Sequence, residues 1–92
     1  MTELKRITEN TREDLADNFK NTELGLIRIA KNLNLLDMAD ADIVSYCREI
    51  ILATPKEKIE QRGKNYYLHC PEHSTILTIN KSSLGIITAK RC

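Results

Sequence analysis

The sequence predicts an α+β domain, with two to three N-terminal helices packed on one face of a C-terminal four-stranded antiparallel β-meander. Four short runs of β-forming residues follow residue 57, and turn-forming residues separate them by gaps so short that neighbouring strands must pair antiparallel. Helical periodicity marks the preceding half, and Pro55 stands where the period changes. The 92 residues suffice for one domain with one core.

The helices are expected before residue 55. Residues 1–20 hold few apolar side chains at helical spacing and predict a helix that docks weakly. Residues 21–54 predict two more helices, the first capped by Thr22 and the second by Asp40 or Asp42. Gly25 lies inside the first of these, where glycine costs about 1 kcal/mol relative to alanine. We expect a close helix approach at Gly25 to be the reason.

Residues 57–90 predict the meander, with strands over 58–62, 65–70, 75–80 and 86–90. Because side chains alternate along a strand, one face should pack on the helices and the other should face solvent. The predicted core face holds Ile59, Tyr66, Leu68, Leu77, Ile79, Ile87 and Ala89. The opposite face then holds Lys58, Glu60, Arg62, Tyr67, His69, Ile76, Thr78, Asn80, Ile86, Thr88 and Lys90. The sheet has two edges, and a homodimer could form through an edge strand.

Composition favours a cytoplasmic protein with no membrane partner. Hydrophobic residues make up 41% of the chain, and no apolar run approaches the roughly 20 residues that span a bilayer. The first residues lack the apolar segment of a signal peptide. The three cysteines include no CxxC pair, which is typical of a reducing compartment.

Charge is distributed unevenly along the chain, although the net charge is only +1. Residues 1–53 carry a net charge of −3, and residues 54–92 carry +4. The sheet half is therefore the part that would face a polyanion. This asymmetry permits contact with phosphates without requiring it.

The sequence predicts neither a metal nor another cofactor. His69, Cys70 and His73 are of the residue types that bind zinc, but their spacing matches no zinc site and 71–73 is explained as a turn. The phosphate-binding, dinucleotide-binding, zinc-protease and serine-hydrolase motifs are all absent from the sequence.

Two functions from different classes fit the polar sheet face. The favoured one is a non-enzymatic protein that binds a macromolecular partner, with binding residues Arg62, Lys64, Tyr67, Asn80, Thr88 and Lys90. The alternative is a metal-free ribonuclease or RNA-binding toxin-like domain, in which His69 would carry protons with Glu60 and Lys90 beside it. A protein partner is favoured over RNA, because the chain has one Phe and no Trp for base stacking.

Several short motifs stand within residues 21–90: Thr22-Glu23-Leu24-Gly25, Arg28-Ile29, Lys31-Asn32-Leu33, Tyr46-Cys47-Arg48, Arg62-Gly63-Lys64-Asn65-Tyr66-Tyr67, Thr78-Ile79-Asn80 and Ile86-Ile87-Thr88-Ala89. Together they resemble an uncharacterised family, a domain of unknown function in small proteins from low-GC Gram-positive bacteria and their phages. Tyr66 and Lys90 stand where that family usually has Trp and His. The resemblance implies no established activity. The favoured binding protein could be encoded by a phage or mobile element, and an anti-CRISPR inhibitor of a host defence nuclease would be a specific version of it. The order of helices and strands also resembles the barnase and RelE ribonucleases.

Overall fold

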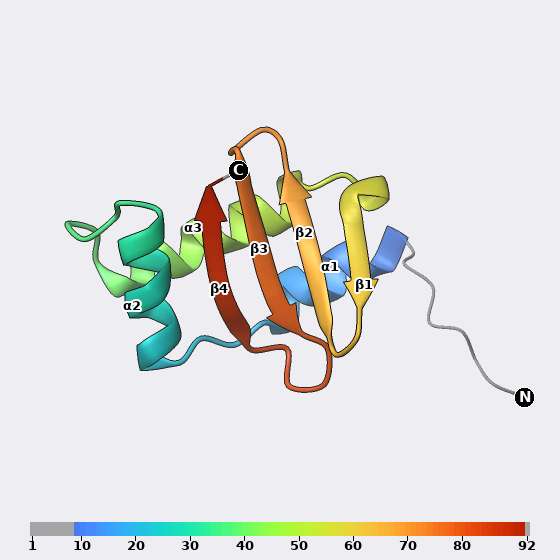
Figure 1. Ribbon diagram of the computed structural model, residues 1–92, viewed down its shortest axis with the longest axis horizontal. Coiled ribbons are helices and arrows are strands. Elements are labelled where there is room, and N and C mark those ends of the chain that lie inside the picture. Colours follow the sequence, from blue (N-terminus) through green and yellow to red (C-terminus); the bar gives the residue numbers. More distant parts are fainter. Residues whose placement is uncertain (1–8, 92) are drawn as a thin grey trace, which may run out of the picture.

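The computed structural model describes residues 9–91 and contains three α-helices followed by four β-strands (Figure 1). The helices are α1 (Glu9–Asn18), α2 (Glu23–Asn32) and α3 (Asp40–Ala53), and a short 3-10 helix, η1 (Lys56–Lys58), leads into the sheet. The strands are β1 (Ile59–Arg62), β2 (Asn65–Cys70), β3 (Thr75–Asn80) and β4 (Ile86–Arg91). They form one antiparallel sheet in the order β1-β2-β3-β4, which confirms the predicted α+β meander.

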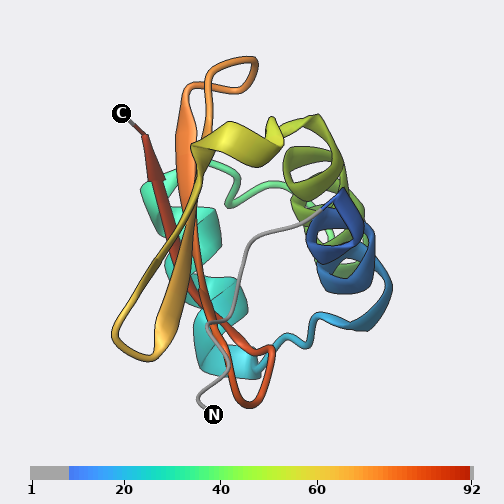
Figure 2. The same ribbon diagram turned by 90° about the vertical axis from the view of Figure 1, so that its right-hand side faces the viewer.

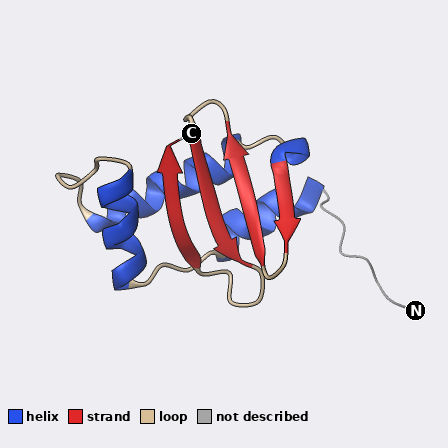
Figure 3. Cartoon of the chain, in the orientation of Figure 1, coloured by secondary structure: helices blue, strands red, loops and turns tan. Residues whose placement is uncertain are grey.

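The helices take two positions around the sheet. Helices α1 and α3 lie side by side behind one face and leave the other face open (Figures 1 and 2). Helix α2 lies beside β4, at the edge of the sheet (Figure 3). The polypeptide just before α2 also covers this edge, because the Ile86 N–H donates a hydrogen bond to the Lys20 carbonyl oxygen at 2.9 Å. None of the helices in the described part of the chain is long and apolar enough to cross a bilayer.

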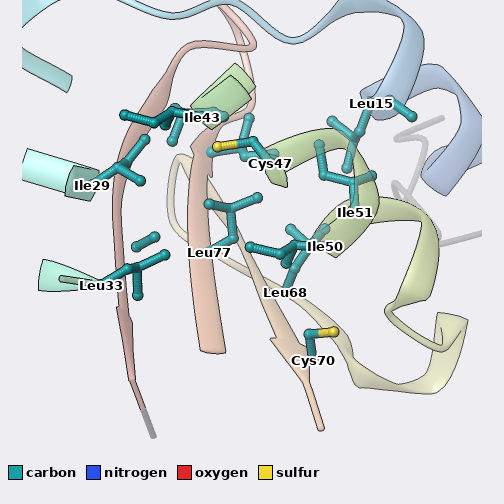
Figure 4. Close-up of a cluster of buried hydrophobic side chains, with 14 of the residues drawn as sticks. Leu15, Ile29, Leu33, Ile43, Cys47, Ile50, Ile51, Leu68, Cys70 and Leu77 are labelled. Atoms are coloured by element: carbon teal, nitrogen blue, oxygen red, sulfur yellow. The ribbon is translucent and has the colours of Figure 1, made fainter. Parts of the chain in front are cut away.

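A single core fills the space between the helices and the sheet (Figure 4). Leu68, Leu77 and Ile79 are fully buried, as predicted from the strand alternation. Helix α1 adds Leu15 and Ala16, each 2% exposed, although its sequence has few apolar side chains. Residues 1–8, the start of the predicted first helix, lie outside the described residues.

A β-bulge makes one prediction about the sheet faces wrong. The β3–β4 pairing shifts between Thr78 and Ile79, so that Thr78 pairs with Thr88 and Ile79 pairs with Ile86. Ile87 is the extra residue between these pairs. Ile86 consequently lies in the core at 3% exposure, and Ile87 is half-buried on the open face. Strict alternation had predicted the reverse for these two residues.

The helix starts confirm one predicted cap and correct another. The Thr22 hydroxyl accepts a hydrogen bond from the Gly25 N–H at 3.0 Å, as expected of an N-cap. The N-cap of α3 is Ala39, which has no capping side chain, so the predicted Asp40 or Asp42 cap is wrong. Both aspartates lie in the first turn of α3, where their charges favour the positive end of the helix dipole.

Candidate functional site

The open face of the sheet brings together polar side chains from all four strands. Cross-strand pairing places Glu60, Tyr67, Thr78 and Thr88 in one row, and His69, Ile76 and Lys90 in the next. Arg62 lies two residues beyond Glu60 on β1, on the same face. Glu60, Arg62, Tyr67, His69, Thr88 and Lys90 were all predicted as candidate site residues, and the sheet gathers them on one surface.

Arg62 makes two contacts that favour one position on this surface. Its guanidinium carbon lies 4.6 Å from the centre of the Tyr67 ring, which is a cation–π geometry. Its Nε is 3.4 Å from Glu60 Oε2. The Tyr67 hydroxyl in turn accepts a hydrogen bond from the Asn65 side-chain amide at 3.4 Å. Arg62 is 63% exposed, so each contact is modest in energy, but together they order a long cationic side chain before any partner binds.

Glu60 also approaches His69. The other carboxylate oxygen of Glu60, Oε1, lies 3.4 Å from His69 Nε2. The Glu60 side chain is 50% exposed and the His69 side chain 39% exposed. The face therefore contains an Arg62–Glu60–His69 chain of contacts that is open to water.

These residues surround a shallow hollow of about 390 Å³. Its lining residues are Arg62, Asn65, Tyr67, His69, Ile76, Thr78, Ile87, Thr88 and Lys90. We call this the sheet hollow. Ile76 and Ile87 are half-buried in it, and Thr78 is only 8% exposed. The sheet hollow thus combines apolar and hydroxyl side chains with two basic side chains, those of Arg62 and Lys90.

Two predicted binding residues lie away from the sheet hollow. Lys64 is exposed in the turn between β1 and β2. The Asn80 side-chain oxygen accepts hydrogen bonds from the Ser82 and Ser83 N–H groups, both at 2.9 Å, and so shapes the turn between β3 and β4. Ile87 is the lining residue that sequence reasoning placed on the wrong face, because no local signal marks the bulge.

The three residues of types that bind zinc, His69, Cys70 and His73, do not come together at one site. His69 points to the open face, whereas Cys70 is buried at 1% exposure on the helix side of the sheet. The His73 ring packs edge-on against Tyr46, with the ring centres 5.2 Å apart. Within residues 9–91, no cluster of three His, Cys, Asp or Glu side chains is arranged to hold a metal ion.

Comparison with known proteins gives a family but no characterised relative. No curated protein matches the chain, and no solved structure matches it, so the expected likeness to barnase and RelE stays a prediction. One family model matches residues 13–90, which is most of the chain. The match includes β1, β2, β3, all of β4 except Arg91, and all residues of the sheet hollow. The chain belongs to the family described as protein of unknown function DUF3781.

Proposed function

We propose that this protein is a non-enzymatic interaction protein that binds a partner protein through the open face of its sheet. The observation that carries the proposal is the Arg62–Tyr67 stack at the sheet hollow. Arginine and tyrosine contribute strongly to binding energy at protein interfaces, and ordered side chains lose less entropy when a partner binds. Lys90, Ile76 and Ile87 complete a surface that offers both charge and apolar area.

The same geometry favours a protein partner over single-stranded RNA. Two aromatic rings, those of Tyr67 and His69, line the sheet hollow, and the Arg62 guanidinium covers one face of the Tyr67 ring. Base stacking needs free aromatic faces, and the small imidazole of His69 with the uncovered face of Tyr67 offers only a limited stacking surface. Ile76 and Ile87 suit apolar side chains better than bases.

A ribonuclease is the second candidate, and the Glu60–His69 pair is the observation that favours it. A carboxylate and an imidazole 3.4 Å apart can exchange a proton, and Arg62 and Lys90 could stabilise negative charge on a phosphate. Against it, all four groups face water. Electrostatic catalysis is strongest where water is excluded. The test is cleavage of a fluorogenic RNA in chelator-treated buffer by wild-type protein and by His69→Ala.

We also propose that a homodimer could form through an edge strand, and one edge of the sheet is open to such pairing. Helix α2 and Lys20 cover the β4 edge, whereas no strand within residues 9–91 pairs with the outer side of β1. A second copy would therefore add at β1. Sedimentation analysis across a range of concentrations tests this, because a dimer would dissociate on dilution.

Affinity purification with matched variants tests the proposed function. The tagged wild-type protein, Arg62→Glu/Lys90→Glu and the control Lys20→Glu/Lys31→Glu are expressed in the native host, and the proteins and RNA that co-purify are identified. The control makes the same change in charge at exposed lysines outside the sheet hollow. We expect a protein that co-purifies with wild type and control but is lost from Arg62→Glu/Lys90→Glu. Retention by this variant, with its circular dichroism unchanged, would contradict the proposal. A host nuclease among the proteins that co-purify with wild type would favour the hypothesis that this protein inhibits a host defence nuclease.

A further inference from the structure

A second hollow, of about 510 Å³, lies where the start of α2 meets β4 and the β3–β4 turn. Its lining includes Leu24, Arg28, Asn80, Ser83, Ile86 and Ile87. We call this the helix hollow. Leu24 and Arg28 are four residues apart on α2, so their side chains share one face of the helix. Leu24 is 56% exposed, so it offers an apolar side chain at the helix hollow.

The two hollows adjoin, because Ile87 lines both. The β-bulge is what turns Ile87 to the open side of the sheet. Together the hollows form one surface that runs from the open face of the sheet onto α2.

Helix α2 is fixed against β4, so this surface exists before any partner binds. The Asn32 side-chain amide donates a hydrogen bond to the Thr88 hydroxyl at 3.1 Å. The Arg91 guanidinium donates to the Leu33 carbonyl oxygen at 3.1 Å, just after the end of α2. At the other end, Gly25 approaches the Ile86 carbonyl oxygen closely. Helix α2 is therefore held against β4 at both of its ends.

The charges on this surface have one sign. Arg28 lines the helix hollow, and Arg62 and Lys90 line the sheet hollow. No aspartate or glutamate is among the described residues that line either hollow. Glu60 stands beside the sheet hollow and is engaged with Arg62 and His69. Between the cations lie the apolar side chains of Leu24, Ile76 and Ile87.

We infer that the occupant is an acidic segment of the partner protein that carries apolar side chains and lies across both hollows. Its carboxylates would face Arg28, Arg62 and Lys90, and its apolar side chains would cover Leu24 and Ile87. The inference rests on the proposed function and adds to it the class of ligand and the role of α2. Complementary charge gives orientation and rate of encounter, and the apolar contacts give most of the lasting affinity.

The inference is tested with a displayed library of random-sequence peptides, from which the peptides that bind the purified protein are selected. The peptides that are enriched are synthesised, and their Kd values are measured by fluorescence anisotropy. Arg28→Glu is paired with the control Lys31→Glu, and Leu24→Gln with the control Ile27→Gln. Lys31 and Ile27 are exposed on the same helix but line neither hollow. Arg62→Glu/Lys90→Glu reports on the sheet hollow, and a single-stranded oligouridine is the competing probe.

We expect the enriched peptides to combine acidic and apolar residues. Arg28→Glu, Leu24→Gln and Arg62→Glu/Lys90→Glu should each weaken their binding about tenfold or more, and the two controls should leave it unchanged. Binding lost only in Arg62→Glu/Lys90→Glu would overturn the inference and leave the proposed function standing. Binding that survives in all the variants would overturn both. Tighter binding of oligouridine than of any peptide, or no enrichment of acidic peptides, would also overturn the inference.

Discussion

Gly25 and the carbonyl oxygen of Ile86 define how closely α2 packs on β4. A Cβ atom added to Gly25 would lie 3.0 Å from that oxygen and 3.0 Å from the Thr22 hydroxyl. Ordinary carbon–oxygen contacts are longer, and the Ile86 oxygen belongs to the backbone of a paired strand, which cannot easily move. The glycine that weakens the helix locally is thus what allows α2 to form the wall of the helix hollow.

Gly25→Ala should destabilise the protein by about 1–2 kcal/mol, although alanine is the better helix former by about 1 kcal/mol. The steric conflict with β4 outweighs the gain in helix propensity. Chemical denaturation followed by circular dichroism measures the free energy of unfolding. Ser45→Ala, at an exposed position in α3, is the control and should be neutral or slightly stabilising. A Gly25→Ala protein more stable than wild type would show that the approach of α2 to β4 is looser than described.

Truncation of the two neighbouring isoleucines tests the β-bulge. Ile86→Ala should lower the free energy of unfolding by about 2–5 kcal/mol, because it removes a buried side chain and leaves a cavity in the core. Ile87→Ala should cost about 1 kcal/mol, because Ile87 is half-buried on the open face. The opposite order of the two values would mean that the strand alternates regularly and that the bulge is absent.

Burial raises the pKa of the Cys47 thiol from its ordinary value of 9.0 to about 11. Between these values the unfolded chain loses the proton while the folded protein keeps it, so the folded state becomes less stable as pH rises. Cys47 should therefore contribute a loss of at most about 1.4 kcal/mol per pH unit in this window. The contribution of Cys47 is measured from denaturation series between pH 8 and pH 11. It is the difference between wild type and Cys47→Ala in how steeply the free energy of unfolding falls with pH. Equal slopes for wild type and Cys47→Ala would contradict the prediction.

The fold follows largely from local signals in the sequence. Turn-forming residues such as Gly63 delimit the strands, and the observed bounds of β2 and β3 match the predicted ones. Thr22 identifies the start of α2 because its hydroxyl satisfies a backbone N–H that the helix leaves free. Regular alternation along β1 and β2 was enough to place Glu60, Arg62, Tyr67 and His69 on one face.

What the sequence did not reveal depends on contacts between distant segments. Ile86 and Ile87 are equally apolar, and only the pairing of β4 with β3 decides which one enters the core. The helix hollow escaped prediction because it needs α2 beside β4, and helical periodicity alone does not specify that position. The cation–π contact of Arg62 with Tyr67 depends on how two exposed side chains lie across neighbouring strands.

The central claim is that the open face binds a protein and that this protein is not a catalyst. The most direct test is to measure the Kd of the co-purified partner for wild type and for three variants. Arg62→Glu/Lys90→Glu should raise the Kd at least about tenfold, because it reverses two cations of the sheet hollow. His69→Ala should change the Kd much less, and Lys20→Glu/Lys31→Glu should leave it as in wild type. Circular dichroism checks that each variant is folded. If Arg62→Glu/Lys90→Glu binds as wild type does, while pure wild-type protein cleaves RNA without metal and His69→Ala does not, the account is contradicted and the protein is a ribonuclease.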